Sequence, residues 1–564
     1  MTDHTITCQL LNRMIEPNIA TENWPIIRPL IDLLHSMSLE GHTSLPLSAA
    51  RQLLSESLTS QWQRALDEEV INSRAISSGQ NPHCPIVFDN GYLYWQRYHH
   101  LEVTIAESLL SRVNPLEFEK STDPVIDRLF NPNNAHERQI DAARIATSQQ
   151  LSIIVGGPGT GKTTTVAKIL ASLVELYDRT SLDILMLAPT GKAAARLAES
   201  MRHQIDQLDV SNDVKAQIPT EAKTIHRAIG LGRHKARFHA NNPLLTDIVV
   251  VDEASMIDAG LMLKLLKALP AKTQLIFLGD ANQLASVEAG SVLADLCLAS
   301  QSPNSRLFGC LAELTHSYRF NDNSGIGRLA SAIKQDNPDD AELILFNESH
   351  PELIHYTDLD IAALCTPYFD YLDTVASIVT DAPQPLIEAL SHFSQWRILA
   401  ATRDGDAGVH ALTERIEAYL AERQSIVPSS EHYRGRPLMV LENDYNQNLF
   451  NGDIGIIVEV DGRLMACFEG ENNQPRLVLP SRLPKVETAY VMTIHKSQGS
   501  EFEGCAVVLP DAPTEAQKSL LTRELLFTGL TRAKKRFVYV GTKKSLRYSI
   551  MNKTQRFSGL TARL

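Results

Sequence analysis

A phosphate-binding loop constrains the fold of this chain more than any other feature of its sequence. Residues 156–163 (GGPGTGKT) match the pattern G-x-x-x-x-G-K-[ST], follow the apolar run LSIIV and open a stretch with helical spacing. Glycines allow successive backbone N–H groups to turn toward a phosphate chain, and the helix N-terminus adds its positive end. Lys162 is suited to neutralise the β- and γ-phosphates, and the hydroxyl of Thr163 to bind Mg²⁺. The loop therefore predicts a nucleoside triphosphate site after a buried parallel strand.

Two α/β blocks are expected after about residue 135, where short β-branched runs alternate with helical stretches. The runs LSIIV, LDILMLA, DIVVVDE and QLIFLGD predict a buried parallel sheet with crossover helices. A second block is expected to begin near Leu311, with the runs RILAAT, CAVVLP and RFVYVG. Within it, the pattern of residues 428–486 predicts a small inserted β-barrel. We therefore expect one α/β domain over residues 129–306 and another over 307–564.

The first 128 residues have a different character. Apolar residues recur every three or four positions in 24–39 and 45–71, which predicts a mostly helical domain. One β-hairpin is expected at the Asn90-Gly91 turn. Residues 123–134 (DPVIDRLFNPNN) are typical of a linker. We find no set of side chains with catalytic chemistry in this region.

Composition excludes several classes of protein. Charged residues make up 21% and hydrophobic residues 43%, which argues against a disordered chain, a collagen-like repeat and a disulfide scaffold. No apolar run approaches the length of a membrane span, and the first 20 residues lack a signal-peptide pattern. The odd number of cysteines, 7, without a CxxC pair, favours a reducing compartment. We therefore expect a cytoplasmic protein with no membrane contact.

A net charge of −13 does not favour binding to nucleic acid, but the charge is unevenly distributed. Residues 531–564 contain ten Lys and Arg residues and no acid, whereas residues 1–130 contain nine against sixteen Asp and Glu. Either the basic segment is a solvated surface, or a local row of cations binds phosphates within an acidic protein.

Further residues suit the hydrolysis of a triphosphate. Asp252 and Glu253 follow the run Ile248–Val251, where one carboxylate can bind Mg²⁺ and the other can activate water. Gln283, after the next apolar run, can sense the γ-phosphate. Arg319 and Arg532, both expected in the second block, can stabilise the transferring phosphoryl group. If both arginines reach the γ-phosphate, hydrolysis depends on closure between the two blocks.

In order along the chain, these segments resemble the motifs of superfamily 1 helicases. The segments are Gln139, GGPGTGKTT (156–164), LAPTGKAAARL (187–197), KTIHRAIG (223–230), VVDEAS (250–255), LGDANQL (278–284), SYR (317–319), TIHKSQGSEF (493–502) and FTGLTRA (527–533). Among these helicases the sequence is most similar to the RecD family, the alpha subunits of exodeoxyribonuclease V (RecBCD). The runs GGPGTGKTTTVAK and NDYNQNLFNGDIG (443–455) carry that resemblance. Neither an NKxD nor an LSGGQ motif is present.

The resemblance implies an ATP- and Mg²⁺-dependent 5′→3′ DNA helicase subunit that processes double-strand ends for recombinational repair. It implies two RecA-like P-loop motor domains with an SH3-like barrel in the second. The implied partners are single-stranded and duplex-end DNA together with RecB-like and RecC-like subunits, and the nuclease would lie on the RecB-like subunit. The acidic N-terminal region would then dock onto the RecC-like partner.

The resemblance also implies roles for individual residues. Those around ATP are Gln139 on adenine, Glu501 on ribose, and the loop residues Gly156, Gly157, Pro158, Gly159, Thr160, Gly161, Lys162, Thr163 and Thr164. Those in catalysis are Lys162, Asp252, Glu253, Gln283, Arg319 and Arg532, with Thr163 and Asp252 on Mg²⁺. Those along single-stranded DNA are Pro189, Thr190, Lys192, Thr224, His226, Thr493, His495 and Lys496. Both histidines have an alternative role in capping or packing their own loops.

Three alternatives remain open in the sequence. The chain could be a stand-alone helicase without partners, or an assembly protein whose P-loop binds ATP without productive turnover. Residues 231–246 fall where RecD-like helicases carry a strand-separating pin, and Arg233, Lys235, Arg237 and Phe238 offer cations and one ring. An exposed loop is the alternative for that segment.

Overall fold

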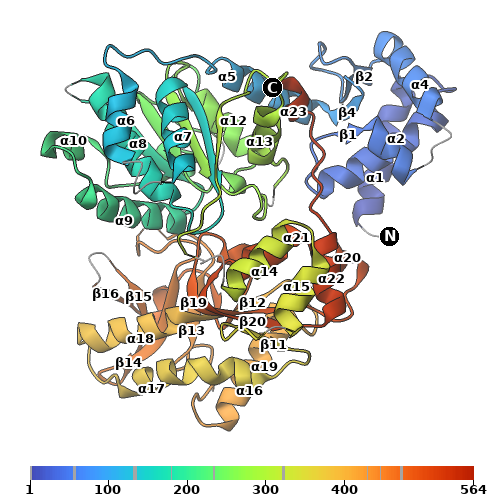
Figure 1. Ribbon diagram of the computed structural model, residues 1–564. Coiled ribbons are helices and arrows are strands. Elements are labelled where there is room, and N and C mark those ends of the chain that lie inside the picture. Colours follow the sequence, from blue (N-terminus) through green and yellow to red (C-terminus); the bar gives the residue numbers. More distant parts are fainter. Residues whose placement is uncertain are drawn as a thin grey trace.

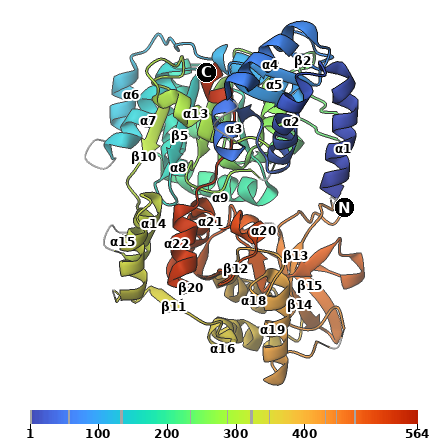
Figure 2. The same cartoon turned by 90° about the vertical axis from the view of Figure 1, so that its right-hand side faces the viewer.

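The computed structural model describes residues 3–54, 59–130, 136–179, 181–232, 235–286, 288–319, 324–347, 349–428, 430–444, 446–470 and 474–564. Two α/β units lie one above the other, and the N-terminal helices lie beside the upper unit (Figures 1 and 2). No helix among the described residues is both long and apolar enough to cross a bilayer.

The N-terminal region combines helices with a small four-stranded sheet of order β1-β4-β3-β2. The predicted hairpin is confirmed: β3 pairs with β4, and the turn residues Asn90 and Gly91 have φ of 51° and 79°, as this tight turn requires. A core of this region's own forms around Ile27, Leu30 and Trp62. The elements are α1 (Asp3–Ile15), α2 (Trp24–Leu39), β1 (Leu45–Pro46), α3 (Leu47–Leu53), α4 (Thr59–Asn72), β2 (Ile76–Ser77), β3 (Ile86–Asp89), β4 (Tyr92–Trp95) and α5 (Gln96–Leu110).

The linker predicted at residues 123–134 is wrong for its first part, because Thr122–Phe130 form helix α6. Ile126 and Phe130 are fully buried against the helices of the next unit. Pro124 stands in the first turn, where a missing N–H costs no intrahelical hydrogen bond. The remaining part of the predicted linker, residues 131–134, lies outside the described residues.

The first α/β domain, as we define it, is the six-stranded parallel sheet β10-β5-β9-β8-β6-β7 with the helices packed on it. Side chains of β5 alternate between two cores: Ile153 packs with α5, α12 and α13, and Ile154 packs with α6, α7 and α8. The elements are α7 (Glu137–Ser148), β5 (Leu151–Gly156), α8 (Lys162–Tyr177), β6 (Ile184–Ala188), α9 (Gly191–Gln207), α10 (Asn212–Gln217), β7 (Lys223–Thr224), α11 (Ile225–Ala228), β8 (Ile248–Val251), α12 (Ala259–Ala268), β9 (Gln274–Gly279), α13 (Val292–Gln301) and β10 (Leu311–Leu314).

The second α/β domain is the five-stranded parallel sheet β11-β20-β19-β12-β18 and its helices. The prediction that the second block begins at 307–311 is wrong, because β10 pairs with β5 in the first sheet. The elements are α14 (Gly325–Lys334), α15 (Pro338–Glu342), β11 (Leu353–Tyr356), α16 (Ile361–Cys365), α17 (Phe369–Ser377), α18 (Pro383–Gln395), β12 (Trp396–Ala400), α19 (Val409–Glu422), β18 (Val491–Thr493), β19 (Phe502–Val508), α20 (Glu515–Lys518), α21 (Arg523–Leu530), β20 (Ala533–Val540) and α22 (Lys543–Met551). Helix α23 (Leu560–Arg563) returns to the first domain.

An antiparallel sheet of order β16-β15-β14-β13-β17 interrupts the second domain between α19 and β18. It occupies nearly the segment expected to be all-β and has its own core around Leu438, Ile457 and Phe468. Closure of this sheet into an SH3-like barrel stays a prediction. The strands are β13 (Pro437–Val440), β14 (Ile454–Val460), β15 (Arg463–Glu469), β16 (Pro475–Val478) and β17 (Val486–Thr488).

Buried hydroxyl and guanidinium groups fasten the base of this insert to the second domain. The hydroxyls of Tyr371 and Tyr490 both donate to the carbonyl of Gly435, where the insert begins. Tyr368 donates to the carbonyl of Tyr490 (2.6 Å), and Arg397 to that of Ala489 (2.7 Å), where the insert ends. Both ends of the insert are therefore held by fully buried side chains.

Candidate nucleotide and nucleic-acid site

The phosphate-binding loop joins β5 to α8 through two glycines in the left-handed region. Gly159 and Gly161 have φ of 76° and 78°, a conformation that glycine adopts without strain. The ammonium of Lys162 donates to the carbonyls of Gly156 (2.6 Å) and Gly157 (3.1 Å). The lysine thus lies along the loop, at the start of the helix, where a phosphate chain would compete for it.

Gln139 and a tyrosine that sequence reasoning did not single out lie against the loop. The backbone N–H of Tyr318 donates to the carbonyl of Gly159 (2.8 Å), and its hydroxyl donates to Gln139 Oε1 (3.3 Å). A Cβ placed on Gly161 would lie 2.8 Å from Gln139 Nε2. The aromatic residue within the SYR segment could have indicated this tyrosine from the sequence. Gln139 and Tyr318 together form a polar and aromatic wall beside residues 159–161.

Three of the predicted catalytic residues, Asp252, Glu253 and Gln283, follow strands that neighbour one another in the first sheet. Asp252 follows β8 and Gln283 follows β9, the strand between β8 and β5. Parallel strands present their carboxyl ends at one edge of the sheet, so these residues face the loop. Glu253 adopts a left-handed φ of 50°, and its N–H donates to Asp252 Oδ1 (2.9 Å). Gln283 donates to Asp280 Oδ2 (3.1 Å).

The charge state of Asp252 depends on its surroundings. Burial, and then the neighbouring Glu253 carboxylate, raise the pKa of Asp252, whereas Lys162 opposes the shift. A carboxylate whose charge is disfavoured in this way is suited to a divalent cation. No group of three metal-ligating side chains occurs in the described part of the chain.

Glu501 of the second domain binds two arginines of the first. Its Oε2 lies 2.9 Å from Arg196 and 2.8 Å from Arg319. Burial alone would raise the pKa of Glu501, but Arg196 and then Arg319 hold it below the usual value. Arg196 was not among the predicted site residues, although its place within the LAPTGKAAARL segment could have indicated it. The ribose contact assigned to Glu501 stays a prediction.

Arg532 lies near this contact, and its hydrogen bonds stay within the second domain. It is 3% exposed and donates to the carbonyls of Thr528 (3.0 Å) and Ser500 (2.9 Å). Burial lowers the pKa of Arg532, and the carboxylates of Glu253 and Glu501 oppose that shift. Arg319 was expected on the second domain, but it follows β10 and therefore leaves the first sheet beside the loop.

Two hydrogen bonds join the domains directly behind Gln283. The N–H of Leu284 donates to Thr528 Oγ1 (3.0 Å), and Gln498 Nε2 donates to the carbonyl of Leu284 (2.9 Å). Residues following the predicted γ-phosphate sensor are thus held by the second domain. Any shift of Gln283 on nucleotide binding would therefore change these two hydrogen bonds.

The predicted DNA-facing residues of the first domain lie at helix starts. Thr190 caps α9 by accepting from the N–H of Ala193 (3.2 Å), and Thr224 caps α11 (3.2 Å). Burial, and then Arg397 and Arg196, lower the pKa of Lys192 to about 8. His226 is exposed. The predicted residues on this side are Pro189, Thr190, Lys192, Thr224 and His226.

The segment that carries the predicted DNA-facing residues of the second domain touches the first domain. A Cβ on Gly499 would lie 3.7 Å from the Cβ of Ala193, so the segment 493–499 touches the start of α9. Lys496 pairs with Glu487 (2.5 Å), which also pairs with Arg403 (3.2 Å). Arg403 was not among the predicted DNA-facing residues, although a cation shortly after β12 could have indicated it. The predicted residues on this side are Thr493, His495 and Lys496.

The role of a pin for residues 231–246 stays a prediction. Phe238 is half-buried against the core of the first domain, and the guanidinium of Arg237 lies 5.3 Å from its ring centre. Short bridges join Leu231 to Ala236 and His239 to Asn242. Lys235 is exposed, and Arg233 lies outside the described residues.

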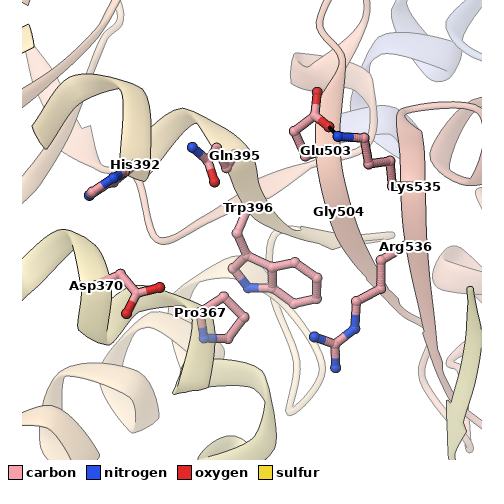
Figure 3. A pocket seen from close by; sticks show the side chains of 9 residues that line it. All are labelled: Pro367, Asp370, His392, Gln395, Trp396, Glu503, Gly504, Lys535 and Arg536. Atoms are coloured by element: carbon pink, nitrogen blue, oxygen red, sulfur yellow. Dashed lines mark ion pairs between the residues drawn. The ribbon is translucent and has the colours of Figure 1, made fainter. Parts of the chain in front are cut away.

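A cavity of about 280 Å³ lies elsewhere, where β12, β19 and β20 begin (Figure 3). Trp396 forms one wall, with the Arg536 guanidinium 5.8 Å from its ring, and Glu503 pairs with Lys535 (2.8 Å). None of the predicted site residues lines it. It combines acidic and basic side chains and does not belong to the nucleotide site.

Comparison with known proteins agrees with this arrangement. Residues 139–289 match the model of an AAA domain, and residues 488–540 match that of a UvrD-like helicase C-terminal domain. The RecBCD enzyme subunit RecD of Mycobacterium tuberculosis (strain CDC 1551 / Oshkosh) is 36% identical, over 95% of this chain and 88% of that protein. The subunit RecD of Haemophilus influenzae is 35% identical, over 85% and 81%.

A third relative differs in length. The ATP-dependent RecD2 DNA helicase of Deinococcus radiodurans is 29% identical over 72% of this chain but only 49% of its own. These two RecD subunits, in contrast, match over 81% or more of both chains and at higher identity. This chain therefore belongs to the RecD family of RecBCD enzyme subunits.

Proposed function

We propose that this chain is the ATP-dependent helicase subunit of a RecBCD-type complex and moves 5′→3′ along single-stranded DNA at double-strand ends. The meeting of the two α/β domains at the nucleotide site supports this most directly. There Glu501 of the second domain binds Arg196 and Arg319 of the first, and the charge of the buried Arg532 lies near the carboxylate of Glu253. ATP bound to the loop would thus complete a site built from both domains. Binding and hydrolysis would then change how the domains close, as a motor requires.

Each residue has a separate task in this mechanism. Lys162 exchanges its loop carbonyls for the β- and γ-phosphates, and Glu253 orients and deprotonates the attacking water. Gln283 contacts the γ-phosphate, and Arg319 and Arg532 offset charge on the transferring phosphoryl group. Thr163 and Asp252 would hold Mg²⁺, which neutralises part of the phosphate charge when bound.

Single-stranded DNA would lie where the start of α9 meets the segment 493–499. Hydroxyls, a helix start and scattered cations suit sequence-independent contact with a phosphate backbone. The insert would support the strand from the second domain. A cycle of closing and opening would let the two sets of residues grip alternately.

Exposed apolar side chains support docking of the N-terminal region onto a RecC-like subunit. Met14 is 72% and Ile71 81% exposed, and Leu10, Leu39, Leu53 and Leu54 are also exposed. Changing Met14 and Ile71 to Glu tests this without deleting α5, which belongs to the first domain's core. We expect lost co-purification with the partner subunits, whereas Val379→Glu, an equally exposed position on the second domain, leaves assembly intact.

The decisive test of the motor is Lys162→Gln in an assembled complex in which only this subunit can hydrolyse ATP. DNA-stimulated ATP hydrolysis should fall at least about 100-fold while assembly is unchanged, because removing a preorganised electrostatic contact costs about 3 kcal/mol or more. Lys272→Gln, an exposed lysine of the same domain, is the matched control. Unchanged hydrolysis in Lys162→Gln would mean that the site is misassigned.

Polarity needs its own assay. Duplexes with a 5′ or a 3′ single-stranded tail are offered to a complex in which only this subunit can hydrolyse ATP. We expect unwinding from the 5′ tail. Unwinding from the 3′ tail alone would overturn the proposed direction and leave the nucleotide site unaffected.

A further inference from the structure

The chain passes between the two α/β domains twice. It leaves the first domain after β10 and returns to it after α22, along the path that runs beside the N-terminal helices (Figure 1). The returning segment, residues 552–559, is called the strap below. It has no regular secondary structure and leads into α23.

The start of the strap is fixed to the second domain. Asn552 donates to the carbonyls of Lys518 (3.0 Å) and Leu521 (2.9 Å). Lys553 pairs with Asp336 (2.6 Å). The N–H of Thr554 donates to Glu524 Oε2 (2.8 Å). Three consecutive strap residues are therefore held by one body.

The next part of the strap is fixed to the first domain and to the N-terminal region. The Arg556 guanidinium donates to the carbonyls of Ser286 (3.1 Å) and Glu288 (3.2 Å), in the loop that follows Gln283. It also donates to the carbonyl of Gly41 in the N-terminal region (2.9 Å).

Phe557 extends the attachment to the N-terminal region. Its N–H donates to His42 Nδ1 (2.8 Å), and its carbonyl accepts from the N–H groups of Thr43 (3.1 Å) and Ser44 (3.4 Å). The rings of His42 and Phe557 are stacked 5.1 Å apart. Further along, Gly559 donates to the buried Glu102 of α5. The strap is thus held from Arg556 onward by backbone and side-chain contacts.

Between the two attachments lies only Gln555. Two peptide units reach about 7 Å at most, so the domains cannot separate further at this edge without breaking one attachment. We propose that the strap is a pivot, which fixes the spacing of the two α/β domains at this edge and passes their rotation to residues 41–44. Opening of the nucleotide site then happens by rotation about the strap rather than by separation of the domains.

The transmission of rotation rests on the proposed motor function, whereas the fixed spacing does not. Arg556 holds the loop that Leu284 joins to the second domain, so a shift at Gln283 has a direct path to Gly41. The N-terminal region, with its exposed apolar side chains, would therefore sense the nucleotide state. A partner docked there would in turn influence closure.

Inserting six Gly-Ser residues between Gln555 and Arg556 tests the pivot in the full chain. Spin labels on non-canonical residues at Leu298 of α13 and Lys544 of α22, both exposed, report the spacing across the strap. Without nucleotide or DNA, we expect a narrow distance distribution in the parent chain. In the insertion variant we expect a broad one extended by about 5 Å or more, within the added chain length. The same insertion in the Asp461-Gly462 turn should leave the distribution narrow.

Arg556→Met keeps the chain length and removes the three carbonyl contacts, which covers the case in which the insertion fails to fold. We expect partial broadening from it. Amide exchange at Thr43 and Ser44 should change with a non-hydrolysable ATP analogue in the parent chain and not in the insertion variant. A distance distribution in the insertion variant that is the same as in the parent chain would overturn the pivot, whatever the helicase activity. A nucleotide response at residues 41–44 that persists in the insertion variant would overturn the transmission.

Discussion

Asp295 of α13 is a buried acid whose protonation should govern the stability of the region around α23. It is 8% exposed, and its Oδ1 accepts from Thr561 Oγ1 (3.0 Å). Burial, and secondarily the nearby Glu102 carboxylate, raise the pKa of Asp295 from 3.8 to about 7. Ser558 and Thr561 oppose the shift only in part. The folded chain therefore keeps this proton over a pH range in which the unfolded chain has released it.

The sign and size of the effect follow from linkage. Between pH 3.8 and about 7 the folded state binds more protons, so the free energy of unfolding falls as pH rises. The fall is about 1.4 kcal/mol per pH unit, or roughly 4 kcal/mol over the whole range. Above about pH 7 the full cost of the buried charge remains. Asp295→Asn removes the titration and keeps an oxygen for Thr561.

Native-state hydrogen exchange of the amides in α13 and α23 is a suitable assay, because it reads local opening and does not require the whole chain to unfold in one step. From pH 5 to pH 8, the opening free energy of Asp295→Asn should gain about 3 kcal/mol relative to the parent chain. Asp213→Asn, at an exposed position of α10, should follow the parent. Parallel pH profiles for Asp295→Asn and the parent chain would refute the reasoning.

Three further predictions concern the nucleotide and DNA sites. Arg403→Ala should reduce the slope of log K against log salt for single-stranded DNA by about 0.7, whereas Glu487→Gln should tighten binding because it frees both Arg403 and Lys496; a filter-binding salt titration measures both. Gln139→Ala should raise the KM for ATP and reduce discrimination against GTP, with kcat within about two-fold by steady-state kinetics, because an amide to the base contributes about 1–3 kcal/mol. Gly161→Ala should weaken binding of a fluorescent ATP analogue at least about ten-fold, since a Cβ at φ 78° is strained by about 1–2 kcal/mol and meets Gln139. A wild-type value in any of these assays would contradict the role given to that residue.

Local signals in the sequence were enough for the sheets and the phosphate-binding loop. Apolar runs such as LSIIV form β5 because a strand covered on both faces needs apolar residues throughout. Membership of a sheet is a tertiary property, which is why LAEL of β10 was placed in the wrong block. Pro124 suggested a linker where it only begins a helix.

Side-chain partners were harder to predict than elements. Glu501 and Arg196 lie some 300 residues apart in sequence, and no spacing rule relates them. The partial burial of Phe238 depends on the core of the first domain rather than on its neighbours in sequence. The loop residues, in contrast, act through a short continuous segment, so their positions followed from the motif. Their individual chemical roles stay predictions.

The tyrosines beneath the inserted sheet have a consequence for how that sheet behaves during a cycle. Because Tyr371, Tyr490 and Arg397 anchor its first and last residues from inside the second domain's core, it cannot swing on a flexible stalk. A DNA strand bound to this sheet would therefore move together with the second domain. Substitution of these anchoring side chains would therefore first lower the thermal stability of the chain. DNA binding would change only when the attachment of the inserted sheet to the second domain is lost.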